Sequence, residues 1–315
     1  MDTLGKCRTR ATLQRALKEL PATLHETYER ILCTINDADS ECAIRIFRWL
    51  AFASRPLSVE ELAEVVAIDV EREPAFDRDE VLEDPMEVLD ICMSLISVVT
   101  IEEPSWSESD LSLSTITQTV TLAHYSVQEY LVSTGICQGR AARYSMQPAI
   151  CHSYIAKASI GYLLQFEKGS FDCFESATSL QQDYTLAQYS AEHWTIHTNS
   201  GEEDDNRLRY LGMKFLSTGD GAYLNWLRLH NPDKPWDTPR LRKELDSCHN
   251  PLYYASHEGL DKIVEVLLSK GADVNAEGGY YGNALQAASA EGHDKVVEVL
   301  LSKGADVNAQ GGSYR

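Results

Sequence analysis

The twelve residues EVLLSKGADVNA occur twice in this chain of 315 residues, at 265–276 and again at 298–309. The repetition extends outward from this core, because residues 252–277 and 285–310 are identical at 20 of 26 positions with an offset of 33 residues. A third copy begins at residue 311, where a glycine pair and a tyrosine return at the same offset. The C-terminal part is therefore a repeat array in which each copy forms one supersecondary unit.

Each copy has the pattern of two helices joined by a tight turn. Gly259 and Gly292 stand where the first helix must turn into the second, a conformation that favours glycine. The apolar residues within 263–268 supply one face of the second helix, and Gly271 and Gly304 end it. A period of 33 residues with this content resembles the ankyrin repeat. The glycine-rich residues 278–283 would then extend the β-turn finger between repeats.

The array departs from the ankyrin family where each first helix begins. The family usually has Thr-Pro-Leu-His, whereas this chain has Asn-Pro-Leu-Tyr at 250–253 and Asn-Ala-Leu-Gln at 283–286. We expect part of the side-chain hydrogen bonding at this point to be lost. Two repeats are too few to bury their apolar faces, since about three are needed. Residues 206–245 are therefore expected to cap the array, unless the array continues past residue 315.

The residues before the repeats have the order of a winged helix. Apolar residues at helical spacing come first, two β-rich runs follow, and a further helix closes the order. The expected helices lie at 9–20, 21–35, 39–53, 58–67 and 85–93, the strands at 95–101 and 117–123, and the closing helix at 126–133. Ser58 and Ser126 each begin a capping-box pattern, which typically starts a helix.

Further helices at 148–166, 184–197, 207–217 and 221–229 predict a connector between the winged helix and the repeats. The predicted fold class is mainly α: a winged-helix module with a two-stranded wing, a helical connector and an ankyrin-repeat solenoid.

The charge balance excludes some function classes. Asp and Glu number 48 against 28 Lys and Arg, which gives a net charge of −20. Such a chain is a poor partner for nucleic acid or for an anionic membrane surface. The acidity is concentrated near predicted loops, since residues 69–90 hold ten acidic and two basic side chains. No apolar run is long enough to span a membrane, and the eight cysteines include no CxxC pair. We expect a cytoplasmic protein.

Four segments carry a resemblance to a known family. They are LPATLHETYERIL at 20–32, RPLSVEELAEVV at 55–66, LDICMSLISVV at 89–99 and LAHYSVQEYLVS at 122–133. In this order, and followed by the repeats, they resemble the region after the NTPase core in fungal NACHT–ankyrin proteins, which are NOD-like, STAND-type signal-transduction NTPases. The resemblance implies four parts: the end of the NACHT module at 1–37, a winged-helix domain at 38–135, a helical connector and repeat cap at 136–245, and ankyrin repeats at 246–315.

Proteins of that family carry an upstream nucleotide-binding domain. No phosphate-binding GxxxxGK[ST] motif occurs in this sequence. We therefore expect this chain to be the middle of a longer protein, without a cofactor of its own. ADP or ATP would bind only through the missing upstream domain.

His124 is the candidate cofactor-binding residue. In the wider NOD-like family, a histidine at the end of the wing strand contacts the bound diphosphate and holds the off state. The resemblance implies the same role for His124 wherever a NACHT core is present, and the alternative is a structural histidine at the strand-to-helix corner. Ser126 is interpreted as a helix cap. His193 and His197 lie one turn apart without a third ligand, so we predict no metal site and no catalytic site.

The predicted function is protein–protein interaction, because ankyrin stacks present a concave binding surface. Tyr253, Tyr254, Tyr280 and Tyr281 are candidate partner-binding residues, since aromatic side chains are enriched at interface hot spots. Their alternative role is packing against the cap or a neighbouring repeat. A protein partner is expected, including a NACHT-domain chain.

Three other functions stay open. The first is a free-standing ankyrin adaptor with no link to a nucleotide. The second is a DNA-binding winged helix, which is disfavoured because the helix at 85–93 carries Glu87 and Asp90 and no basic residue. The third is an enzyme of unrecognised type.

Overall fold

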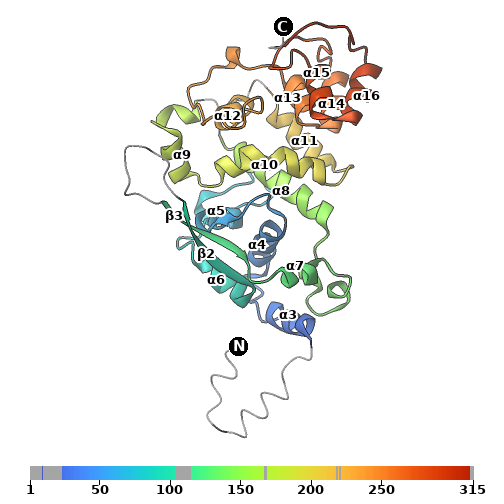
Figure 1. Ribbon diagram of the computed structural model, residues 1–315. Helices are drawn as coiled ribbons and strands as arrows, with labels where there is room; N and C mark the ends of the chain where they lie inside the picture. The colour runs from blue at the N-terminus through green and yellow to red at the C-terminus, as the bar shows by residue number, and fades with distance from the viewer. Residues whose placement is uncertain are drawn as a thin grey trace. The chain divides into compact units, whose positions relative to one another are not determined.

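The computed structural model describes residues 9, 23–103, 115–166, 169–217, 219 and 221–312. These residues are mainly helical with a small amount of strand (Figure 1), which confirms the predicted class. The helix expected at 9–20 lies outside the described residues except for Thr9. The chain divides into two compact units, Met1–Ala51 with Met86–Gln147 and Phe52–Pro85 with Pro148–Arg315.

The first unit contains the predicted wing. Its elements are α3 (Leu24–Leu32), most of α4 (Ser40–Phe52), α6 (Glu87–Cys92), β2 (Ile96–Glu103), β3 (Thr115–Leu122) and α7 (Tyr125–Val132). Strands β2 and β3 pair antiparallel over their whole length, from Ile96 opposite Leu122 to Glu103 opposite Thr115. Helix α4 lies within a residue of its predicted bounds because its apolar stripe is regular, and Phe47 and Trp49 are completely buried on it.

The second unit begins with β1 (Leu57–Ser58) and α5 (Val59–Val66). The capping box at Ser58 is present as predicted: its hydroxyl accepts from the Glu61 amide at 3.1 Å, and the Glu61 carboxylate accepts from the Ser58 amide at 2.8 Å. Glu64 on the same helix accepts hydrogen bonds from the Tyr162 hydroxyl at 2.7 Å and from the Leu186 amide at 2.8 Å. These bonds anchor α5 to the connector helices.

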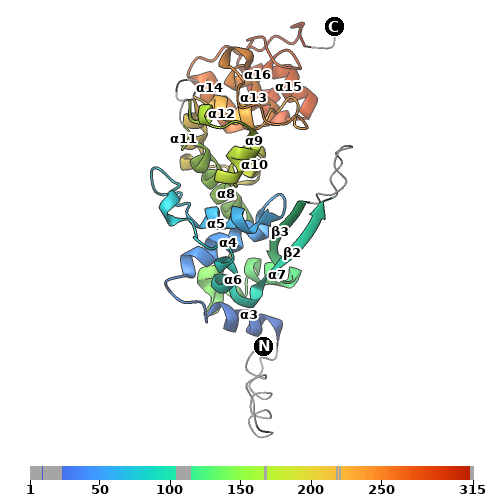
Figure 2. The same cartoon turned by 90° about the vertical axis from the view of Figure 1, so that its left-hand side faces the viewer.

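The connector is a bundle built on two long helices. Helices α8 (Pro148–Leu163) and α10 (Ala187–Ser200) run side by side (Figures 1 and 2). Small residues along α8, among them Ala156, Ala158 and Gly161, are buried, and Gly161 leaves room for Ala75. Helices α9 (Ala177–Asp183), α11 (Asn206–Phe215) and α12 (Ala222–Leu229) complete the bundle. The sequence pattern did not predict α9, whose seven residues bury a single leucine.

The repeats form a two-layer stack of four helices (Figure 2). The helices are α13 (Pro251–His257), α14 (Asp261–Ser269), α15 (Ala284–Glu291) and α16 (Asp294–Ser302). Helix α13 packs along α15, and α14 packs along α16. Gly259 and Gly292 have φ of +72° and +76°, as the tight turns require.

The segment predicted as a cap packs against the repeats. Helix α11 packs against α14, and the ring of Trp226 on α12 lies 6.0 Å from that of Tyr254 on α13, edge to face. A second link runs from α10, where the Thr195 hydroxyl donates to the Glu258 carboxylate at 2.7 Å. The repeats are therefore joined to the connector through both of their helical layers.

The expected loss of hydrogen bonds at the start of each first helix is wrong. The side-chain oxygen of Asn250 accepts from the Tyr253 amide at 2.9 Å, and that of Asn283 accepts from the Gln286 amide at 2.8 Å. Asparagine is among the best N-cap residues, so it replaces the family's threonine without leaving the amides unpaired. Gln286 also donates to the Ala309 carbonyl in the next finger at 3.1 Å.

Candidate protein-interaction site

The first finger is a closed loop between α14 and α15. Glu277 and Asn283 pair across its base, and the Gly278 amide donates to the Gly282 carbonyl at 2.8 Å. The loop carries Tyr280 and Tyr281, whose side chains are partly exposed. These two tyrosines stay candidates for contact with a partner.

The prediction of Tyr253 and Tyr254 as contact residues is corrected by their burial, since their exposed fractions are 0% and 1%. Tyr254 faces the cap, and the ring of Tyr253 lies under the finger. The Tyr253 hydroxyl donates to Asp233 at 2.5 Å and accepts from the Tyr281 amide at 3.3 Å. Burial and the hydrogen bond to Asp233 raise the pKa of Tyr253, so the hydroxyl remains a donor.

Asp233 joins three segments on one carboxylate. It belongs to the loop between α12 and α13, and it also accepts from the Tyr280 amide at 3.4 Å. The first helix of the repeat, the finger and the cap loop therefore meet at this residue. Sequence reasoning missed Asp233 because a loop residue has no periodic pattern that would predict its contacts.

A cavity of about 470 Å³ lies beside this junction, and we call it the finger-side cavity. Its walls come from the end of α12, the loop after it, Tyr254 on α13 and Gly279 with Tyr280 in the finger. The charged residues in its lining are Arg228, Asp233, Lys234, Asp237, Arg240 and Lys243.

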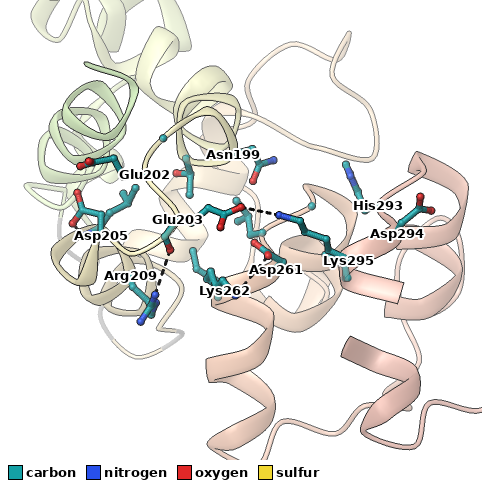
Figure 3. A pocket seen from close by; sticks show the side chains of 17 residues that line it. Asn199, Glu202, Glu203, Asp205, Arg209, Asp261, Lys262, His293, Asp294 and Lys295 are labelled. Carbon is teal, nitrogen blue, oxygen red and sulfur yellow. Dashed lines mark hydrogen bonds and ion pairs between the residues drawn. The ribbon is translucent and has the colours of Figure 1, made fainter. Parts of the chain in front are cut away.

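A second cleft, of about 330 Å³, lies at the turns that join the first and second helices of the repeats (Figure 3). Both of its lysines are paired within the chain: Lys295 on α16 contacts Glu203 at 3.0 Å, and Lys262 contacts Glu265 at 3.3 Å. Asp205 caps α11 and forms an ion pair with Lys157 at 2.8 Å. The ion pair between Lys295 and Glu203 therefore links the second repeat to the connector across this cleft.

His124 is the N-cap of α7, and the interpretation of Ser126 as the cap is wrong. The His124 Nδ1 accepts from the Ser126 amide at 3.2 Å and lies 2.7 Å from the Ser126 hydroxyl. That hydroxyl is in turn 2.7 Å from the hydroxyl of Tyr28. The imidazole therefore fixes the strand-to-helix corner through Nδ1, and Nε2 carries the proton in the neutral ring. The side chain is exposed.

His197 on α10 is completely buried and faces α8. Its Nδ1 lies 2.9 Å from the Nδ1 of His152, and its Nε2 lies 2.9 Å from the hydroxyl of Tyr189. Burial, together with the neighbouring His152 and His193, lowers the pKa of His197 to about 3. Within the described ranges, no three His, Cys, Asp or Glu side chains gather as a metal site requires. Nor does any helix in those ranges have both the length and the apolar character needed to cross a membrane.

Two known protein families match parts of this chain. Residues 28–106 match the winged helix domain of GPI inositol-deacylase, and residues 220–311 match a family described as ankyrin repeats in three copies. These matches confirm the predicted winged helix and repeats. The ankyrin match begins before α12, so it includes the segment that caps the repeats. The NACHT part of the family resemblance stays a prediction.

One curated protein is similar along most of the chain. It is the azaphilone pigments biosynthesis cluster protein L of Monascus ruber, which is 34% identical over 291 residues. The aligned region covers 89% of this chain and 59% of that protein, so the chain spans about three fifths of its relative's length. No solved structure matches.

The finger should be sensitive to a methyl group at Gly279. This residue has φ of +84°, and a Cβ there would lie 1.8 Å from Cζ of Tyr253. We expect Gly279→Ala to lower the free energy of unfolding by more than about 2 kcal/mol. Gly271→Ala is the matched control, because Gly271 has φ of +91° with no atom within 4 Å of its Cβ position. It should cost only about 1–2 kcal/mol. The free energies of unfolding are measured in urea. Equal losses in the two variants would show that the Tyr253 ring moves aside without an energetic cost.

The buried His197 should make the fold sensitive to acid. Its pKa is about 3 in the folded state, below the ordinary value of about 6.5, so folding disfavours the protonated ring. Stability is then complete above about pH 6.5 and falls as the pH drops below it, by up to about 1.4 kcal/mol per pH unit. His197→Gln should destabilise the protein at pH 7 and much less at pH 5. Urea unfolding at both values measures this, with His25→Gln as an exposed control. If His197→Gln loses the same unfolding free energy at pH 7 and at pH 5, the low pKa of His197 is contradicted.

Proposed function

We propose that this chain is the regulatory and protein-binding part of a NACHT–ankyrin-type signal-transduction protein, without catalytic activity of its own. Ankyrin repeats bind proteins, and the observation that carries the proposal for this array is the first finger. Tyr280 and Tyr281 are partly exposed on a loop that Asp233 and Tyr253 hold from below. A loop fixed in advance loses little conformational entropy on binding, which favours recognition of a partner.

The regulatory part of the proposal rests on the first unit. The geometry of His124 fits contact with a nucleotide, because Nδ1 is used in capping α7 and leaves Nε2–H as an exposed donor. A phosphate oxygen of a nucleotide held by an upstream NTPase domain would be its acceptor. His124 would then couple the nucleotide state to the corner between β3 and α7.

A free-standing adaptor is the alternative, and it differs by showing no association with a NACHT-containing chain. DNA binding finds no support in α6, where Glu87 and Asp90 are exposed. A recognition helix would need basic side chains at such positions.

The contact role of the finger can be tested by partner capture. A protein captured from a cell extract on the immobilised chain is identified, purified and titrated directly. The double variant Tyr280→Ala/Tyr281→Ala should weaken binding at least tenfold, about 1.4 kcal/mol, because hot-spot aromatics would be lost. Tyr210→Ala is the matched control, since Tyr210 is 52% exposed on α11. It should change the affinity less than twofold. Unchanged binding by the double variant would contradict the proposal.

The nucleotide role of His124 requires a longer protein that joins this chain to its NACHT core. His124→Asn keeps a capping acceptor for α7, whereas His124→Ala removes the cap as well. Both variants should retain less ADP through purification, measured by chromatography after denaturation. Retention by His124→Asn equal to that of the unmodified protein would show that the residue serves only as a cap.

A further inference from the structure

The finger-side cavity has a different charge from the rest of the chain. The chain carries a net charge of −20, whereas the cavity lining holds four Arg or Lys side chains and two Asp side chains. We propose that this cavity binds an acidic segment of the partner protein, with carboxylates on Lys234 and Lys243. The inference rests on the proposed protein-binding function and names the chemistry of the partner.

Both acidic residues of the lining are already engaged. Asp233 accepts from the Tyr253 hydroxyl and the Tyr280 amide, and Asp237 forms an ion pair with Arg240 at 3.0 Å. Lys234 is exposed and Lys243 is partly exposed. Neither ammonium group has a hydrogen-bond or ion-pair partner among the described residues. The cavity therefore presents two unpaired cations to a ligand.

The wall that carries Lys243 is held in place by a buried arginine. Arg228 on α12 is 7% exposed, and its Nε donates to the Lys243 carbonyl at 2.8 Å. Its carbonyl accepts from the Arg240 amide at 2.7 Å, and its Nη1 donates to Asn225 at 3.2 Å. Lys243 thus stands on a fixed part of the loop, which lowers the entropy cost of binding.

Two further features of the same loop suit a peptide. The side-chain oxygen of Asn231 is buried and has no hydrogen-bond partner within the described residues, so it can accept a backbone N–H. Trp236 follows Lys234 by two residues and is 78% exposed, the highest value among the large hydrophobic residues described. Tryptophan is enriched at interface hot spots, and Trp236 lies in the sequence between Lys234 and Asp237, which line the cavity. The expected ligand is therefore an acidic segment with an apolar side chain.

The cleft of Figure 3 lacks this character. Its Lys295 and Lys262 are paired with glutamates, and Glu202 and Asp294 add negative charge to its lining. An acidic segment would meet net repulsion there. At physiological ionic strength, the charges of the acidic loops elsewhere are screened beyond about 8 Å. The local charge of the finger-side cavity therefore determines whether an acidic segment is attracted to it.

The probe for this proposal is a fluorescein-labelled peptide, Asp-Glu-Leu-Glu-Glu-Leu-Asp-Glu, titrated against the full chain by fluorescence anisotropy. We expect saturable binding that weakens with salt, and at least 30-fold weaker binding by Lys234→Glu/Lys243→Glu. Trp236→Ala should weaken binding several-fold. The control Lys270→Glu/Lys303→Glu makes the same charge change on exposed lysines at the ends of α14 and α16, and should weaken binding less than threefold. Circular dichroism and urea unfolding establish that each variant is folded.

Equal losses in the two double variants would overturn the proposal, because they would show attraction by overall charge alone. Equal binding of a Lys-Leu peptide of the same length would overturn it as well. The captured natural partner separates this inference from the proposed function. A partner that depends on Tyr280 and Tyr281 but is indifferent to Lys234 and Lys243 refutes the acidic site and leaves protein binding intact. A partner indifferent to all four residues refutes the proposed function itself.

Discussion

The contact between Trp226 and Tyr254 closes an apolar face that two ankyrin repeats leave open. A repeat buries its helices only against a neighbour, and no near-identical copy precedes the first repeat in the sequence. Helix α12 takes that place, with Trp226 packed edge to face against Tyr254 and also against Trp194 of α10. Removing a buried tryptophan costs about 3–5 kcal/mol in proteins generally, so this cluster determines whether the array can fold.

The position of the finger depends on the same contact. Tyr253 and Tyr254 are neighbours on one short helix, and α13 is fixed through Tyr254. Tyr253 can then meet Asp233, which comes from the loop that follows α12. The finger rests on that pair, and Gly279 leaves room for the ring beneath it. Apolar packing of the cap therefore positions the polar groups available to a partner.

Sequence reasoning predicted those parts whose signal is periodic or local. The repeats follow from an offset of 33 residues, and α4 and the capping box at Ser58 follow from spacing within a few residues. The structure has them at the expected places. It failed where a side chain finds its partner far along the chain. Tyr253 was expected to contact a partner protein, yet its partner Asp233 lies 20 residues away in a loop. His124 replaces Ser126 as the cap because its Nδ1 accepts from the Ser126 amide, a role that residue preference does not reveal.

The two repeats differ at the positions that face their neighbours, although most of their sequence is the same. Tyr253 and Tyr254 in the first correspond to Gln286 and Ala287 in the second. The tyrosines fit the cap, whereas the small Ala287 is completely buried where α15 packs on α13, and Gln286 reaches the following finger. The first repeat is thus adapted to the cap, and the second is adapted to a repeat on either side. An array of this design lengthens by duplication of the second repeat, which leaves the junction with the connector unchanged.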